Sequence, residues 1–198
     1  PKEQRGVSLL IDIENSIKAQ ESRGYEQWAK IHNLKLAAKT MNFLTEHQIE
    51  QYADLVSRIE EISAENEKTA DTLKSVEKRL ADMAVLMKHV TTYKKTKPVY
   101  EAYRRAKDKD AYRAKQESSL ILHEAAAKAL KAAGVTKLPN LAAMQEEYGK
   151  LQAQKEALYT DYGKLKKQVK EYDVIKQNID NILRQGKEPE RKKGKERE

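Results

Sequence analysis

Several residue types are scarce in this chain of 198 residues, and each scarcity excludes a class of protein. Cysteine is absent, which excludes a disulfide scaffold, a thiolate metal site and a cysteine nucleophile. Seven glycines and four prolines supply too few turns for a β-barrel or sandwich. A single Phe and a single Trp argue against a large globular core. Apolar runs such as 85–87 and 120–122 are too short to span a membrane.

The residues that are abundant favour long helices. About half of the chain is Ala, Glu, Leu, Lys or Arg, a composition typical of coiled coils. The formal net charge is +8, which favours an acidic partner. The lack of cysteine fits a reducing, cytoplasmic location. The first residues, PKEQR, contain neither an initiator Met nor an apolar signal region, so we expect a piece of a longer chain.

Two long segments repeat apolar residues at alternating spacings of three and four. This 3.5-residue period keeps one seam of a helix facing a partner helix, and it predicts two coiled-coil arms, residues 51–97 and 140–184. The first seam is Tyr52, Leu55, Ile59, Ile62, Asn66, Thr69, Leu73, Val76, Leu80, Met83, Met87 and Val90. The second seam is Leu141, Met144, Tyr148, Leu151, Lys155, Leu158, Tyr162, Leu165, Val169, Tyr172, Lys176, Ile179 and Leu183.

Polar residues interrupt these seams, and they have two interpretations. Asn66, Lys155 and Lys176 stand at the first apolar position of their heptads, where a polar residue can specify register and oligomeric state. Alternatively, the lysines lay their methylene stems along the seam and keep the ammonium in water. The second interpretation is favoured for the lysines, and the two are equally weighted for Asn66.

A basic helical tip and turn, residues 98–139, is expected between the arms. Pro98 lacks an N–H and disfavours helical geometry in the residue before it, which predicts a kink or an end of the first arm near Thr96. A short helix should then run from Pro98 to about Lys107. Asp108 or Asp110 is the expected cap of the next helix.

Turn residues predict where the second arm begins. Gly134 is suited to the left-handed conformation that closes a helix, so the preceding helix should end at Ala133. Residues 135–139 should form a turn, with Pro139 in the first turn of an arm that starts near Asn140. So short a connection favours an antiparallel hairpin, and the predicted fold is all-α, elongated and built on a long antiparallel coiled-coil hairpin.

The ends of the chain complete this expected organisation. Apolar stripes predict helices at residues 7–18 and 25–46, separated by Gly24, and this N-terminal part (residues 1–50) should pack on the base of the hairpin. Residues 184–198 contain no apolar side chain, so residues 185–198 are expected to form a disordered charged tail.

Positive charge is concentrated in residues 88–115, which we call the basic segment. It holds ten Lys and Arg against three Asp and Glu, together with four of the ten tyrosines. Cations release counterions from phosphates and tyrosine rings stack on unpaired bases, which predicts a nucleic-acid contact. An equally weighted interpretation is that the tyrosines pack a helix junction while the lysines face solvent. The candidate nucleic-acid-binding residues are Lys94, Lys95, Lys97, Tyr100, Tyr103, Arg104, Arg105 and Arg113.

Catalytic chemistry is not indicated for this segment. His32, His47, His89 and His123 are isolated and do not share metal-ligand spacing on a helical face. His32 and His89 fall near apolar stripes and are expected to be ordinary interior or boundary residues. A glycine-rich phosphate loop and a nucleophile elbow are both missing. We expect a non-enzymatic segment without catalytic residues, metal or cofactor.

Two stretches carry a resemblance to a known family. The first has GYEQWAK at 24–30, NLK at 33–35 and AKTMNFLTE at 38–46. The second has YKKT at 93–96, VYEAYR at 99–104, LHEAA at 122–126 and GVTKLP at 134–139. Together they resemble the region behind the nuclease domain of MobA-type mobilisation relaxases of integrative conjugative elements in Firmicutes. The likeness extends over nearly the whole chain, and the first stretch is the more specific.

The resemblance implies a parent protein that nicks one strand at a transfer origin, using a tyrosine and a metal held by histidines. Neither motif can be matched here, so no catalytic residue carries over. The implied partners are transfer-origin DNA, accessory mobilisation proteins or the coupling machinery. One hypothesis is DNA binding through the basic tip, and the other is a protein-interaction or dimerisation arm, with a monomer favoured. A nucleic-acid-binding arm like the coiled-coil hairpin of some tRNA synthetases is the alternative outside this family.

Overall fold

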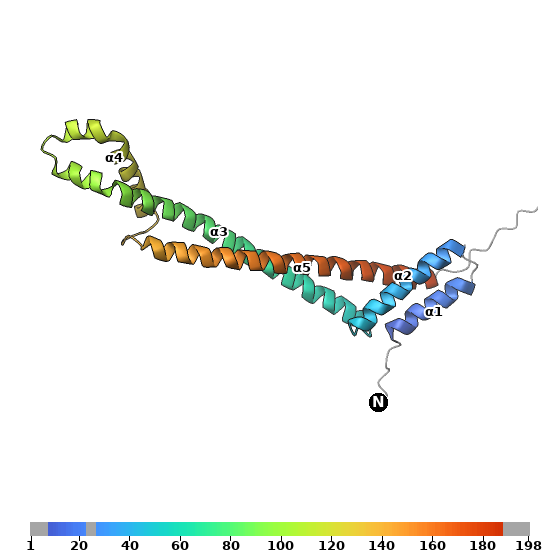
Figure 1. Cartoon of the computed structure of the whole chain (residues 1–198). Coiled ribbons are helices and arrows are strands. Elements are labelled where there is room, and N and C mark those ends of the chain that lie inside the picture. Colours follow the sequence, from blue (N-terminus) through green and yellow to red (C-terminus); the bar gives the residue numbers. More distant parts are fainter. Residues whose placement is uncertain (1–7, 23–26, 188–198) are drawn as a thin grey trace, which may run out of the picture. The chain divides into compact units, whose positions relative to one another are not determined.

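The computed structural model describes residues 8–22 and 27–187, and the side chains of 27–33 fall outside the description. Figure 1 shows its five α-helices in chain order. Since the described residues contain no strand, the all-α prediction is confirmed. No helix among them is both long and apolar enough to cross a bilayer. The helices are α1 (Leu9–Ser22), α2 (Gln27–Glu46), α3 (Tyr52–Arg105), α4 (Lys109–Ala132) and α5 (Leu141–Lys187).

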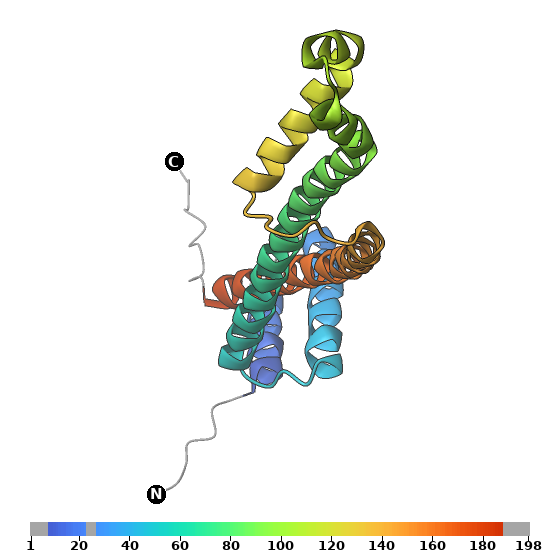
Figure 2. The ribbon, with the colours of Figure 1, turned by 90° about the vertical axis from the view of Figure 1, so that its left-hand side faces the viewer.

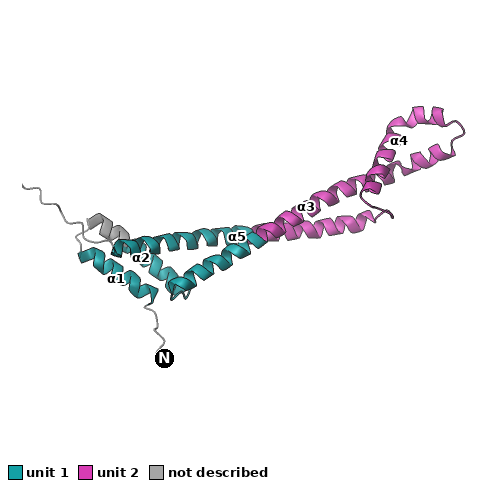
Figure 3. Ribbon diagram, turned by 180° about the vertical axis from the view of Figure 1, so that it is seen from behind, with its two compact units in different colours: residues 1–68, 162–198 teal, residues 69–161 magenta. Residues whose placement is uncertain are grey.

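The chain forms two compact units (Figure 3). Unit 1 comprises residues 1–68 and 162–198, and unit 2 comprises residues 69–161. The long helices α3 and α5 contribute to both units, so each unit contains one stretch of each helix.

Unit 1 is built on a single apolar core. Leu9 and Ile13 of α1, Leu44 of α2, Leu55 of α3 and Ile179 of α5 are all almost fully buried in it. The predicted N-terminal helices therefore pack against the first turns of α3 and the last turns of α5. Backbone bonding ties their ends together as well, because the Leu9 N–H donates to the Glu50 carbonyl over 2.9 Å.

A close helix contact marks the C-terminal end of this core. Gln20 of α1 is buried and its Nε2 donates to the carbonyl of Ile182 over 3.4 Å. Close by, a Cβ placed on Gly186 would lie only 2.6 Å from Ser16 Oγ and 2.9 Å from Ser16 Cα. Glycine is therefore required where α5 passes α1, because the obstructing atoms include backbone.

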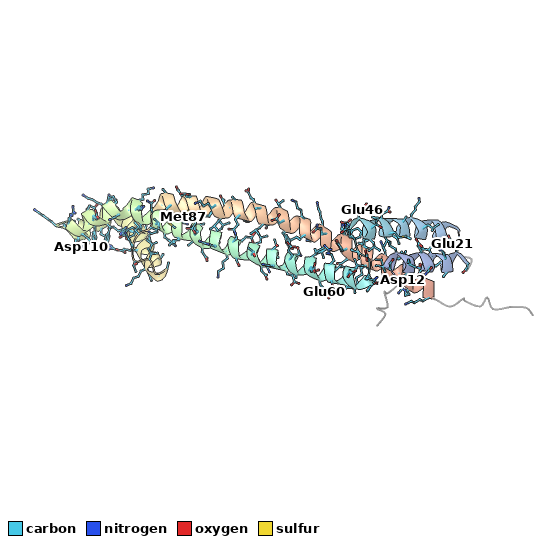
Figure 4. The ribbon with its side chains drawn as sticks, turned by 90° about the horizontal axis from the view of Figure 1, so that it is seen from below. Asp12, Glu21, Glu46, Glu60, Met87 and Asp110 are labelled. Carbon is cyan, nitrogen blue, oxygen red and sulfur yellow. The ribbon has the colours of Figure 1, made fainter. Side chains whose placement is uncertain are left out.

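In unit 2, α3 and α5 pair in opposite directions. Lys155 lies 3.4 Å from Glu77, while Arg79 pairs with Glu147, so residue numbers rise on one helix as they fall on the other. Met87 of α3, labelled in Figure 4, belongs to the apolar contacts at the start of α5. Every position of the two predicted seams is buried or half-buried across units 1 and 2. Side chains at the centre of the unit 2 pairing are Val76, Leu80, Met83, Tyr148, Leu151 and Leu158.

The polar seam residues divide into two kinds. Lys155 and Lys176 are half-buried and carry their ammonium groups out to Glu77 and Asp180, as the methylene-stem interpretation predicts. Asn66 differs, because its Oδ1 is buried without a hydrogen-bond partner among the described residues. The Asn66 side chain is therefore the seam residue that fits the interpretation in which a polar residue specifies the register of the coiled coil.

The first arm does not end near Thr96, so the predicted helix end there is wrong. Helix α3 continues through Pro98 to Arg105, and the separate short helix from Pro98 is not formed. The ring of Pro98 leaves the carbonyl of Lys94 without its helical N–H partner. That loss falls on an exposed surface, where water can replace the bond, while Thr96 on the opposite side remains buried.

The predicted boundaries of α4 and the predicted start of α5 hold to within a residue, whereas α1 continues to Ser22, four residues beyond its predicted end. Asp108 caps α4 by accepting from the Ala111 N–H at 3.0 Å, and Gly134 has the left-handed φ of 74° after the last turn. Asn140 caps α5, accepting from two backbone N–H groups, so Pro139 precedes the helix instead of lying in its first turn. Helix α5 extends to Lys187, three residues into the predicted tail, and residues 188–198 lie outside the description.

Candidate nucleic-acid interface

The candidate interface lies in unit 2, on the last turns of α3 and the first turns of α4. Figure 4 marks this part of the molecule with Asp110, which stands in the first turn of α4. Along α3 the charged residues recur at helical spacing, so most of them share one outward face. The exposed residues of that face are Lys94, Lys97, Glu101, Arg104 and Arg105, with Lys95 exposed beside it.

Most of these cations are available to a ligand. Lys97 is 3.8 Å from Glu101, but both side chains are about half exposed, which makes the pair weak. Lys94, Lys95, Arg104 and Arg105 have no ion-pair partner within the part of the chain that the structure describes. Four unpaired cations therefore stand on the outside of the last turns of α3.

Arg113 is held differently from the other candidates. Its two terminal nitrogens donate to the two carboxylate oxygens of Glu124, each over 3.2 Å, and its guanidinium lies 5.9 Å from the centre of the Tyr103 ring. The hydrogen bonds to Glu124 raise the pKa of Arg113. Helix α4 bends at Gln116, which has non-helical φ and ψ, and the pair spans that bend. Arg113 thus has a structural partner already and is less available for phosphate.

The inner face of the same α3 turns packs on α4 through a buried histidine. His123 is 3% exposed, and its ring stacks against Tyr100 at 4.4 Å and Tyr93 at 4.5 Å between centroids. Its Nδ1 lies 2.9 Å from Oγ1 of Thr96, which is also buried. Figure 2 shows the second half of α4, in yellow, running beside α3.

The hydrogen bonds of Thr96 indicate which ring nitrogen of His123 carries the hydrogen. The Thr96 hydroxyl donates its single proton to the Thr92 carbonyl at 2.7 Å, as helical threonines do. It therefore accepts at His123, so Nδ1 carries the hydrogen. Desolvation lowers the pKa of His123, outweighing the opposing effect of Glu124, and the ring is neutral at pH 7.

The candidate tyrosines are engaged within the protein. Tyr100 is half-buried against His123, and Tyr103 lies 6.4 Å from the ring of Tyr112 and beneath Arg113. The placement matches the interpretation in which tyrosines pack a helix junction and lysines face solvent. His123 therefore already covers one face of the Tyr100 ring.

Sequence reasoning did not anticipate the role of His123. It treated all four histidines as isolated and expected His32 and His89 to be interior or boundary residues. His89 is half-buried, as expected, but the fully buried histidine is His123. The side chain of His32 lies outside the description. A usable signal was present in the spacing of Tyr93, Thr96 and Tyr100, which places all three on one helical face.

Among the described residues, no group of three or more His, Asp or Glu is placed to hold a metal ion. No family model matches the chain, and neither the curated proteins nor the solved structures contain a match to it.

Proposed function

We propose that this chain is a non-catalytic helical module that binds transfer-origin DNA through phosphate contacts of its basic segment. The observation that carries the proposal is the group of exposed, unpaired cations on the outer face of α3, Lys94, Lys95, Arg104 and Arg105. The segment they belong to has a net charge of +7, nearly all of the chain's formal charge. Cations clustered in this way are suited to release counterions from a phosphate backbone.

The expected contact is to phosphates and not to bases. Stacking on unpaired bases needs free aromatic faces, and His123 already covers one face of Tyr100 and lies tilted against Tyr93. A duplex should therefore bind at least as tightly as a single strand of equal phosphate number. A clear preference for single strands would show that the rings leave their packing to reach bases.

The parent protein is proposed on the resemblance alone. We infer a C-terminal module of a MobA-type mobilisation relaxase, with DNA nicking performed by a part of the parent that this segment does not contain. We also infer that α3 and α5 pair as one elongated antiparallel coiled-coil hairpin with the basic segment at its end. That pairing is supported by the fact that every seam position is buried or half-buried.

The test reverses the charge of the four cations and compares a matched control. Lys94, Lys95, Arg104 and Arg105 are replaced together by Glu, and binding to transfer-origin duplex is measured by fluorescence anisotropy at low salt. The control replaces four exposed lysines of α5 in the same way: Lys164, Lys166, Lys167 and Lys170. The proposal predicts a much larger loss of affinity in the first variant, because both variants change the net charge equally. Equal losses of DNA affinity in the two variants would mean that only the net charge of the chain matters. That result would contradict the proposal.

Protein interaction is the second candidate function. It is favoured by Ile121 and Leu122 of α4, two neighbouring apolar side chains that are 52% and 53% exposed. Adjacent exposed apolar residues on one helix are typical of an interaction surface. Loss of binding to an accessory mobilisation or coupling protein on changing Ile121 and Leu122 to Ser would support this role.

A further inference from the structure

Helix α4 consists of two parts that meet at Gln116. The φ and ψ of Gln116 are −124° and 24°, which are not helical, and the two parts run in different directions (Figure 2). The second part is fixed to α3, because Leu120, His123, Ala126 and Leu130 are buried on its inner face. The first part begins after the cap at Asp108 and carries Arg113.

The ion pair between Arg113 and Glu124 depends on this bend. The two residues are eleven positions apart, which in an unbroken α-helix places them on the same face but about 16.5 Å apart along the axis. That separation is longer than an arginine and a glutamate can bridge through a hydrogen bond. In the bent helix, both terminal nitrogens of Arg113 lie 3.2 Å from carboxylate oxygens of Glu124. The ion pair therefore closes across the bend and stabilises it.

Arg113 also lies among the cations of the basic segment. Its guanidinium is 5.9 Å from the centre of the Tyr103 ring of α3, and Arg104 and Arg105 follow Tyr103 directly in the chain. Lys107 and Lys109, which lead into α4, are exposed. Phosphates attracted by these cations therefore come to the part of the molecule where Arg113 lies.

A phosphate can replace Glu124 as the partner of Arg113. A guanidinium offers a planar fork of two N–H donors, and carboxylates and phosphates both present two oxygens to such a fork. The side chains of Arg113 and Glu124 are 41% and 46% exposed, so a ligand can reach them. An ion pair this exposed is weak, and its carboxylate returns to water at little cost when the partner leaves.

We propose that Glu124 is an internal competitor of phosphate for Arg113, and that DNA binding exchanges this partner and releases the bend of α4. The inference rests on the DNA binding proposed above and concerns the regulation of that site. In the free chain, Glu124 holds Arg113 and lowers the affinity for DNA. In the bound chain, Arg113 adds a phosphate contact, and the first part of α4 is free to change its direction relative to the second.

A double-mutant cycle tests the competition. Glu124→Gln should tighten binding to origin duplex at low salt about two- to fivefold, the range expected when an exposed ion pair no longer competes. Glu117→Gln is the control, because it removes the same charge from an exposed position of the same helix, and its gain should be smaller. Arg113→Gln should weaken binding about two- to fivefold more in the Glu124→Gln chain than in the parent. The same loss in both backgrounds would overturn the competition.

A second variant in the same series distinguishes this inference from the DNA binding on which it rests. The chain in which Lys94, Lys95, Arg104 and Arg105 are all replaced by Glu should lose affinity. If it does so while Glu124→Gln gains no more than its control, DNA binding stands and the competition is wrong. If it binds as tightly as the parent, the proposed DNA binding fails and the present inference fails with it.

Spin labels on either side of the bend test its release, since the chain has no natural cysteine. Ala111→Cys and Ala132→Cys place labels at exposed positions near the two ends of α4. Double electron–electron resonance should show a longer or broader distance between the labels when origin duplex is added. Glu124→Gln should cause a similar change without DNA. An unchanged distance distribution in both experiments would overturn the release of the bend, provided that circular dichroism shows each variant to be folded.

Discussion

At the scale of single residues, His123 is the group most sensitive to its surroundings. It is buried between two tyrosine rings and donates to Thr96, with Glu124 and Lys97 as the nearest charged groups affecting it. Because desolvation lowers its pKa in the folded state, the unfolded chain binds this proton at a higher pH than the folded chain does. The free energy of unfolding should therefore fall as pH drops below about 6.5, the ordinary pKa of histidine.

Two variants test whether His123 causes this pH dependence of the free energy of unfolding. His123→Gln should be less stable than the parent at pH 7.5 but should lose less stability between pH 7 and pH 5 in urea unfolding. Thr96→Val should cost about 1–3 kcal/mol at pH 7.5, because Nδ1–H loses its acceptor in a buried place. An identical pH profile in the parent and His123→Gln would contradict the neutral, buried histidine.

The glycines of α5 give a second prediction at this scale. Gly186→Ala should destabilise the chain by about 1–3 kcal/mol, because the added Cβ meets both the side chain and the backbone of Ser16. Gly163→Ala in the same helix has nothing within 4 Å of the new Cβ, and it should stabilise by about 0.5–1 kcal/mol. Thermal melting followed by circular dichroism distinguishes the two. A stabilising Gly186→Ala would mean that α1 does not pack on α5 there.

At the scale of helices, the pairing of α3 with α5 can be tested by introducing an Asp at a buried position and at an exposed position of α3. Leu80 is 7% exposed against α5, and Val85, five residues later on α3, is 56% exposed. Leu80→Asp should lower the free energy of unfolding by several kcal/mol, on the order of the cost of an unpaired buried charge. Leu165→Asp should also lower it. Val85→Asp should stay within about 0.5 kcal/mol. Similar melting temperatures for Leu80→Asp and Val85→Asp would rule out the pairing of α3 with α5.

Much of this helical arrangement follows from local patterns. The 3.5-residue period depends only on which residues are apolar. Every position that it assigned to the two seams is buried or half-buried in α3 or α5. Asp108 and Gly134 were also predictable, because a cap and a left-handed turn are set by one residue each.

Features that depend on distant partners could not be predicted in the same way. Pro98 was expected to kink or end a helix, but Thr96 before it and Tyr100 after it both pack on His123 of α4, and these contacts hold α3 together across the proline. Tyr100 and Arg113 looked available for a ligand, yet His123 and Glu124 of α4 occupy them. His123 is separated from Tyr100 by the turn at 106–108, and Glu124 is separated from Arg113 by the bend at Gln116, so helical spacing gives no information about either contact.

At the scale of the whole chain, charge decides how the proposed DNA binding responds to salt. Binding through the basic segment should weaken as salt rises, because fewer counterions are released from the phosphates at high salt.

The most direct test of the central claim is the slope of log affinity against log salt for origin duplex. Each phosphate contact contributes about −0.9 to that slope. Replacing Lys94, Lys95, Arg104 and Arg105 by Gln should therefore make it shallower by about three to four units, while replacing Lys164, Lys166, Lys167 and Lys170 by Gln should leave it nearly unchanged. An unchanged slope in the first variant would contradict the account, because it would mean that the exposed cations of α3 do not meet phosphates.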